Sequence, residues 1–139
     1  MDKYKEIRPI ALGVIVKDGK ILAENCYDEV KDQKFYRCLG GGIEFLEKSE
    51  DTLKREFKEE IGADVEVGEF LGICENIFNY QGKDAHELVL FYKAKLKDED
   101  IKEEYFKLDD DHNKITWVNI DDLKDKKMII YPQEVLEYI

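Results

Sequence analysis

The chain has 139 residues, of which 43% are hydrophobic and 40% charged, and its formal net charge is −11 at pH 7. This length suits a single domain over residues 1–139 with one sizeable core, and it is too short for two ordinary domains. A sequence-independent grip on nucleic acid comes from Lys and Arg neutralising phosphates, so this acidic chain argues against non-specific nucleic-acid binding. A polyanionic ligand would instead need a metal bridge.

The cysteines and the N-terminal residues indicate where the protein resides. Cys26, Cys38 and Cys74 are odd in number and widely spaced, and no Cys-x-x-Cys pair is present. We therefore expect a reduced, cytoplasmic protein without structural zinc. Residues 1–6 lack the apolar segment of a signal peptide, and the apolar run Ala11–Val16 is far shorter than the ~20 residues that span a bilayer. We expect no membrane role.

Three β-type runs open the chain. Ile7–Lys17 and Lys20–Cys26 flank Asp18-Gly19, a strong hairpin signal, and should pair antiparallel. Phe35–Leu39 is apolar apart from Arg37 and leads directly into Gly40, Gly41 and Gly42, so we predict a strand that delivers a glycine-rich loop to a site. Arg37 could face an anionic substrate or lie on the surface of the strand.

A helix is predicted over Glu50–Ile61, with Ser49 as N-cap and Gly62 as the left-handed residue that ends it. At about 100° per residue, one stripe of this helix is apolar and a second stripe is acidic. The apolar stripe is Leu53, Phe57 and Ile61, and the acidic stripe is Glu56, Glu59 and Glu60. Like charges three and four residues apart cost about 0.2–0.5 kcal/mol per pair. Such a cluster suits a hard divalent cation such as Mg²⁺ or Mn²⁺.

The remaining chain predicts further strands and two short helices. Val65–Ile77 is β-rich with bends at Gly68 and Gly72, a turn follows at residues 80–84, and Glu87–Leu96 should be a strand with a buried middle. The acidic segment Lys97–Lys114 is either a solvated loop or delivers an acid to the site, the candidates being Glu103, Glu104 and Asp109–Asp111. A strand at residues 115–118 comes next, containing Trp117, which should be a core residue. Asn119 or Asp121 could cap a helical turn, and Pro132 should open a C-terminal helix.

The glycine loop and the helix together carry a spaced motif. Gly41 is followed after five residues by Glu47, and after seven more by Arg55-Glu56-Phe57-Lys58-Glu59-Glu60-Ile61-Gly62-Ala63. This pattern resembles the signature of the Nudix (MutT-like) hydrolases, Gly-x5-Glu-x7-Arg-Glu-U-x-Glu-Glu-x-Gly-U, where U is a bulky apolar residue. The small Ala63 fills the last apolar position. Leu46 and Leu39 stand where the family commonly has glycine and often has proline.

The resemblance implies a fold and an activity. The fold would be α/β, an α/β/α sandwich with a mixed central β-sheet, and the order of the expected elements agrees with it. The activity would be hydrolysis of a nucleoside diphosphate linked to another moiety, with water attacking phosphorus. The cofactor would be Mg²⁺ or Mn²⁺, held by Glu56, Glu59, Glu60 and the Gly41 carbonyl. Glu47 matches an acid near the metals, and Arg55 matches an arginine that orients carboxylates.

The general base varies in this family, so several acids remain candidates. Glu56 is our first choice and Glu59 the next, while an acid from a later loop stays open. The substrate-binding candidates outside the motif are Arg37, Glu87, Phe78 and Tyr80. Glu87 alternates with apolar residues, which suggests that it lies on an inward face, where an acid requires a partner or a functional role. Core packing competes with base stacking for Phe35, Tyr36, Phe78 and Tyr80, and a strand-end hydrogen bond competes with a site role for His86.

Two other functions compete with hydrolysis. A Nudix-fold module could bind or sense a nucleotide without cleaving it, although no carboxylate of the motif is missing. A non-enzymatic divalent-ion-binding protein is the other alternative, but no EF-hand spacing supports it. The motif addresses only the diphosphate, so it leaves open the identity of the small nucleotide-type substrate. An exposed strand edge could support a homodimer.

Overall fold

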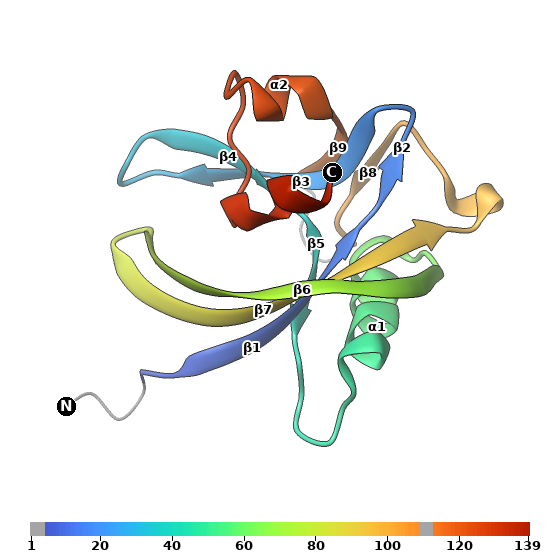
Figure 1. Cartoon of the computed structure of the whole chain (residues 1–139), viewed down its shortest axis with the longest axis horizontal. Helices are drawn as coiled ribbons and strands as arrows, with labels where there is room; N and C mark the ends of the chain where they lie inside the picture. Colours follow the sequence, from blue (N-terminus) through green and yellow to red (C-terminus); the bar gives the residue numbers. More distant parts are fainter. Residues whose placement is uncertain (1–4, 109–112) are drawn as a thin grey trace.

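The computed structural model describes residues 5–108 and 113–139 and contains two β-sheets (Figure 1). Sheet A has the strand order β5 (Leu39–Gly42), β1 (Ile7–Val14), β7 (Lys83–Leu96) and β6 (Val65–Tyr80). It is mixed, because β1 runs parallel to β7 and antiparallel to β5. Sheet B has the order β2 (Val16–Lys17), β3 (Lys20–Asp28), β9 (Lys114–Asn119) and β8 (Glu104–Phe106), and β4 (Gln33–Arg37) also pairs with β3.

Helix α1 (Ser49–Ile61) packs against sheet A, with contacts to β5, β1 and β6. Its predicted apolar stripe is confirmed, since Leu53, Phe57 and Ile61 are all buried. Burying each of these side chains contributes about 1.5–3 kcal/mol relative to exposure. Gly62 ends the helix at φ 66°, as predicted. The predicted Ser49 cap is wrong, because the N-cap is Lys48, without a side-chain cap bond, while the Ser49 hydroxyl lies 2.6 Å from the Tyr92 hydroxyl.

The predicted N-terminal hairpin is partly wrong. Asp18 and Gly19 do form the turn, at φ 52° and 75°, but only the short β2 pairs with β3 in it. The segment before it, β1, lies in sheet A between β5 and β7. Consecutive residues 10–14 are all buried, and such a run needs a covered position on both faces of a sheet, which a two-stranded hairpin does not provide.

The strand predicted over Phe35–Leu39 is two strands that belong to different sheets. β4 ends at Arg37 in sheet B, and β5 begins at Leu39 in sheet A. Cys38, between them, is buried with its side chain in the cluster around α2 (Ile120–Lys124), while Leu39 is buried in the cluster around α1. The chain therefore crosses from one sheet to the other just before the glycine loop.

The strands predicted over Val65–Ile77 and Glu87–Leu96 are confirmed as β6 and β7, which are longer than predicted and pair as one hairpin. Gln81 and Gly82 form its turn, at φ 53° and 78°. The register shifts between Val67 and Phe70 and again between Phe70 and Gly72, which confirms irregularities near Gly68 and Gly72. Within the described part of the chain, β6 pairs with β7 alone and so lies at an edge of sheet A.

Two hydrophobic clusters hold the sheets together, and each draws residues from both sheets. The α1 cluster contains Ala11 and Tyr92 of sheet A and Ile115 of sheet B. The α2 cluster contains Leu12 and Phe91 of sheet A, and it also receives residues from α2 (Ile120–Lys124) and from the C-terminal turn η2 (Gln133–Tyr138). Helical segments thus cover both faces of sheet A, which confirms an α/β sandwich with a mixed sheet.

The C-terminal elements differ in detail from the expectation. Asn119 caps α2 by accepting a bond from the Asp122 amide at 3.3 Å, as predicted. Pro132 precedes the C-terminal turn, but this turn is a 3₁₀-helix rather than an α-helix. Trp117 is half-buried rather than a full core residue, and its indole N–H donates to the Lys102 carbonyl at 2.7 Å. The acidic segment forms a short turn, η1 (Asp98–Asp100), before β8.

Two hairpin tips are joined by one buried carboxylate. Asp28, at the end of β3, accepts bonds from the amides of Val30 and Lys31 in its own hairpin and of Gln81 in the β6–β7 turn. The Gln81 side chain returns a bond from its amide to the Tyr27 carbonyl at 3.3 Å. The two sheets are therefore tied together far from α1. Among residues 5–108 and 113–139, no helix is long and apolar enough to cross a membrane.

Candidate active site

Arg55 of α1 is the centre of a carboxylate cluster. Its Nε lies 2.8 Å from Glu47 Oε2, and its Nη2 lies 3.0 Å from Glu47 Oε1, a two-pronged contact. Its Nη1 lies 2.8 Å from Glu56 Oε1 and 3.3 Å from Glu59 Oε2. Nη2 also donates to the Gly42 carbonyl at 3.1 Å. One guanidinium thus joins the loop to two helix acids, the role that the resemblance implies for Arg55.

Glu47 is held ionised by this arrangement. Hydrogen bonds from Arg55 and then from the Thr52 hydroxyl lower the pKa of Glu47 from 4.5 to about 2. The same contacts to Glu47 and Glu56 raise the pKa of Arg55. Glu47 therefore acts in this structure as a fixed anion that positions the arginine.

The glycine loop is shaped by close approaches. A Cβ on Gly41 would lie 2.5–2.8 Å from the carboxylate atoms of Glu56, so a side chain there would displace that carboxylate. Gly40 has φ 150°, and a Cβ on it would meet the Ala11 carbonyl oxygen at 1.9 Å. Leu46, where the family commonly has glycine, adopts φ 68° and is exposed. A leucine thus occupies a left-handed backbone position in this loop.

Glu60, the third acid of the stripe, pairs with a different cation from Glu56 and Glu59. Its Oε1 is 4.0 Å from the Lys107 ammonium, which in turn lies 2.8 Å from Glu24 Oε1. The acidic segment thus brings a lysine to Glu60. Glu103 is exposed, and Glu104 pairs with Lys114 at 2.6 Å. Asp109–Asp111 lie outside the described residues.

The helix acids are arranged around cations of the protein. In the described ranges, no group of three or more His, Cys, Asp or Glu side chains is close enough to hold a metal ion. Glu56 and Glu59 turn to Arg55, and Glu60 faces Lys107. The donor set still fits a hard cation, since it consists of carboxylate oxygens beside the Gly41 backbone, where glycine leaves the approach open.

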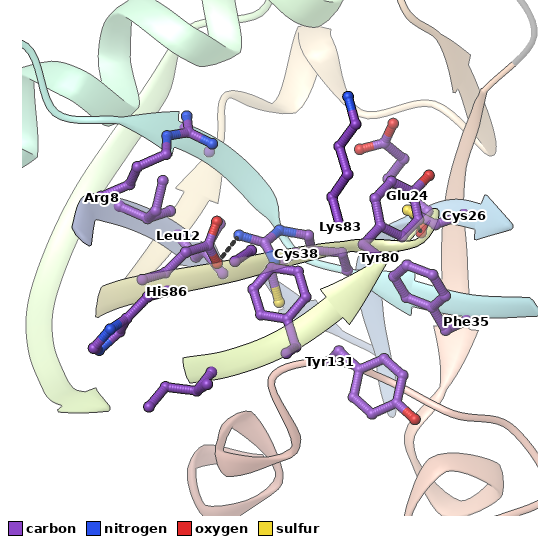
Figure 2. A pocket seen from close by; sticks show the side chains of 18 of the residues that line it. Arg8, Leu12, Glu24, Cys26, Phe35, Cys38, Tyr80, Lys83, His86 and Tyr131 are labelled. Atoms are coloured by element: carbon purple, nitrogen blue, oxygen red, sulfur yellow. Dashed lines mark hydrogen bonds and ion pairs between the residues drawn. The ribbon is translucent and has the colours of Figure 1, made fainter. Parts of the chain in front are cut away.

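A cleft of about 1470 Å³ leads from this helix between the two sheets. Glu60, Gly40 and Gly41 line one part of it, and Arg37 and Glu87 line another. Figure 2 shows Arg8 and His86 towards one end and Phe35, Tyr80 and Tyr131 towards the other. The cleft therefore reaches the glycine loop of the motif and is large enough for a nucleotide-sized molecule.

Two of the predicted substrate residues form an ion pair. Arg37 Nη2 lies 2.9 Å from Glu87 Oε1. Glu87 is buried at 5% exposure, so the inward face predicted for it is confirmed, and Arg37 is its counter-ion. Asn76 of the neighbouring β6 also reaches Glu87 Oε1, at 3.5 Å.

Aromatic side chains form the opposite part of the cleft. The Phe35 ring meets Tyr80 edge-on, with centroids 5.8 Å apart, and meets Tyr131 at 5.3 Å. Phe78 also lines the cleft. Tyr131 was missed in the sequence because it lies in an irregular segment, and Lys107 and Glu24 were missed because nothing in their local pattern shows that they meet.

Comparisons with known proteins agree with the motif. The family model described as the NUDIX domain matches residues 7–139. No curated protein sequence matches the chain significantly. Among solved structures, a NUDIX hydrolase from Nitrosomonas europaea is similar, with a TM-score of 0.66 and 18% identity over 95% of this chain and 85% of that one.

Two further structures share the fold. A MutT NUDIX hydrolase from Burkholderia pseudomallei gives a TM-score of 0.62 at 20% identity, over 97% of this chain and 99% of that one. A MutT protein from Bacillus halodurans gives 0.64 at 18% identity, over 94% and 80%. At this identity the structures establish the fold, while the family model spans nearly the whole chain. The chain therefore belongs to the Nudix (MutT-like) hydrolase family.

Proposed function

We propose that this chain, as one Nudix domain over residues 1–139, is a metal-dependent pyrophosphohydrolase that cleaves a nucleoside diphosphate linked to another moiety. The observation that carries the proposal is the Glu56 carboxylate packed against Gly41 and bonded to Arg55 at 2.8 Å. A smaller residue could fill the same space beside the glycine, so packing alone does not require an acid at position 56. Gly41, which this carboxylate contacts, lines the large cleft.

A bound Mg²⁺ or Mn²⁺ would neutralise the diphosphate oxygens and lower the pKa of a water molecule. In our proposal Glu56, Glu59, Glu60 and the Gly41 carbonyl hold this cation. Glu59 is 60% exposed at its side chain and can leave Arg55 at little cost. Arg55 and Glu47 keep the loop and the helix in register through their two-pronged contact.

The chain also supplies a proton acceptor for the attacking water. Glu56 is the first candidate and Glu59 the second, because Glu56 contacts Gly41 and both acids bond to Arg55. A positioned general base contributes about 10²–10⁴ to the rate. An acid from a later loop stays a candidate, although Glu103 is exposed and Glu104 is paired with Lys114.

The cleft suits the nucleoside end of such a substrate. We propose that the Phe35, Phe78 and Tyr80 side chains contact the base, and that Arg37 and Glu87 bind polar atoms of the substrate. The edge strand β6 could support a homodimer.

A hydrolysis screen tests the proposal. Nucleoside triphosphates and their oxidised forms, sugar-linked nucleoside diphosphates, dinucleoside polyphosphates and capped RNA would each be incubated with Mg²⁺ or Mn²⁺. We expect cleavage within a diphosphate and, in ¹⁸O-labelled water, label in a phosphate product. Label in a sugar or base fragment would contradict the proposal. Tight nucleotide binding without turnover would instead favour a binding or sensing module.

A further inference from the structure

Lys107 is half-buried between two acids, one from a strand of sheet B and the other from helix α1. Its ammonium lies 2.8 Å from Glu24 of β3 and 4.0 Å from Glu60 of α1. The three side chains are 19%, 11% and 15% exposed, respectively. All three line the same cleft.

The backbone beside Lys107 is also fixed. The amide of Leu108 donates to the Glu60 carbonyl at 2.8 Å, in the last turn of α1. The Asn113 side chain bonds to Glu24 Oε1 at 3.1 Å, so two residues that follow β8 meet at the same carboxylate. The ammonium is therefore directed at the cleft by the main chain as well as by its counter-ions.

This arrangement differs from the other lysine ion pairs of the protein. Lys58 with Asp64 and Lys95 with Glu66 are more than half exposed at every side chain, and such pairs contribute little to stability. A buried pair has to offset the desolvation of both charges, and apolar residues of the same volume often do as well. A half-buried lysine held at the cleft by a buried glutamate therefore indicates a role beyond stability.

We propose that Lys107 is a phosphate-binding residue of the active site and that Glu24 is the residue that positions it. The proposal rests on the proposed function, because Glu60 is there a ligand of the cation that binds the diphosphate. An anionic group brought to Glu60 comes beside the Lys107 ammonium, which can donate three N–H bonds to phosphate oxygens. The ammonium adds positive charge at a cleft wall that otherwise carries two carboxylates.

The test uses methylenediphosphonate, a diphosphate analogue that cannot be hydrolysed, with Mg²⁺ and calorimetric detection. Lys107→Met should weaken its binding by about tenfold or more, the range of one charge-assisted hydrogen bond. Lys107→Arg should restore affinity to within a few fold. Lys114→Met is the matched control, because Lys114 pairs with Glu104 on the surface, and it should leave the affinity unchanged.

A metal-free thermal melt of the same variants separates binding from structure. Wild-type affinity in Lys107→Met, or a wild type that does not bind the analogue, would overturn the proposal. So would a loss of affinity that Lys107→Arg does not restore and that accompanies a large fall in melting temperature. The hydrolysis screen is scored separately: nucleotide cleavage with no dependence of analogue binding on Lys107 rejects this inference alone, whereas Lys107-dependent binding without cleavage of any nucleotide rejects the proposed hydrolysis alone.

Discussion

The carboxylate of Glu56 lies against the Cα of Gly41, so that a Cβ on residue 41 would come within 2.5 Å of the Glu56 Cδ. Helix and loop therefore approach each other at a point where a side chain cannot be accommodated. The contact couples the backbone of the loop to the acid that we propose as the general base.

Gly41→Ala should move Glu56 out of place and lower turnover by about tenfold or more, while the protein stays folded. A rigid Cβ meets the carboxylate at 2.5–2.8 Å, and the long side chain can yield more easily than the sheet. Gly42→Ala is the control, because its Cβ would meet only the mobile end of Arg8, at 3.3 Å. Steady-state rates and circular dichroism measure both effects. Equal rates in the two variants would show that the Gly41 contact has no part in catalysis.

Glu56→Gln and Glu60→Gln should each reduce turnover by about two or more orders of magnitude, the range expected for a positioned proton acceptor. Both side chains are polar groups of the cleft region and not core contacts, so the fold should persist. The measurement is kcat on a substrate identified in the screen. Near wild-type rates in both variants would refute the assignment of these acids.

Glu59→Gln separates the cation site from the fold. The sequence alone predicts repulsion along the acidic stripe in the metal-free protein, but Arg55 donates to both Glu56 and Glu59. Because Glu59 is 60% exposed and its contact is 3.3 Å long, its loss should change the metal-free unfolding free energy by less than about 1 kcal/mol.

Metal should stabilise the wild type more than this variant. A ligand at a hundredfold excess over its Kd stabilises the folded state by about 2.7 kcal/mol, and Glu59→Gln should reduce that gain. Thermal melts over a Mg²⁺ or Mn²⁺ titration at constant ionic strength measure it. A wild type whose melting temperature ignores the metal, with and without a nucleoside diphosphate, would contradict the proposed site.

Glu47 should make the free energy of unfolding depend on pH in the acidic range. Arg55 lowers the pKa of Glu47 from 4.5 to about 2, so the stabilisation is complete above pH 4.5 and is lost as the pH falls towards 2. Denaturant unfolding of wild type and Glu47→Gln should show a constant difference above pH 4.5 that shrinks below it. Glu50→Gln, an acid of the same helix outside the Arg55 contacts, is the control. A difference that is independent of pH would mean that Arg55 does not set this titration.

The predictions from sequence succeeded where one local pattern decides the structure. The stripe of Leu53, Phe57 and Ile61, the left-handed Gly62 and the inward Glu87 follow from periodicity and backbone preference alone. The predictions failed where distant segments compete. Residues 10–14 could not be assigned to sheet A without knowing that β1 pairs with β7. The Ser49 hydroxyl contacts Tyr92, 43 residues away, instead of capping the helix.

The site divides in the same way. The motif spacing identifies Arg55 and its carboxylates, because these residues are close in the sequence. Lys107 and Glu24 are 83 residues apart, and no pattern in either segment indicates that a half-buried lysine would meet Glu60. The helix-centred part of the site is thus predictable, whereas the part made by contacts between strands and the segment after β8 requires the fold.

The crossing of the chain at Cys38 sets a length. Arg37 ends β4 and Gly41 lies in β5, and the residues between them are anchored in different hydrophobic clusters. Four residues of extended chain reach at most about 14 Å. This covalent segment therefore limits the distance between the Arg37 end of the cleft and the glycine loop. Sliding of one sheet against the other cannot lengthen this segment, whereas one inserted residue would. The number of residues in the connection therefore sets the length of a ligand that can contact both Arg37 and the glycine loop.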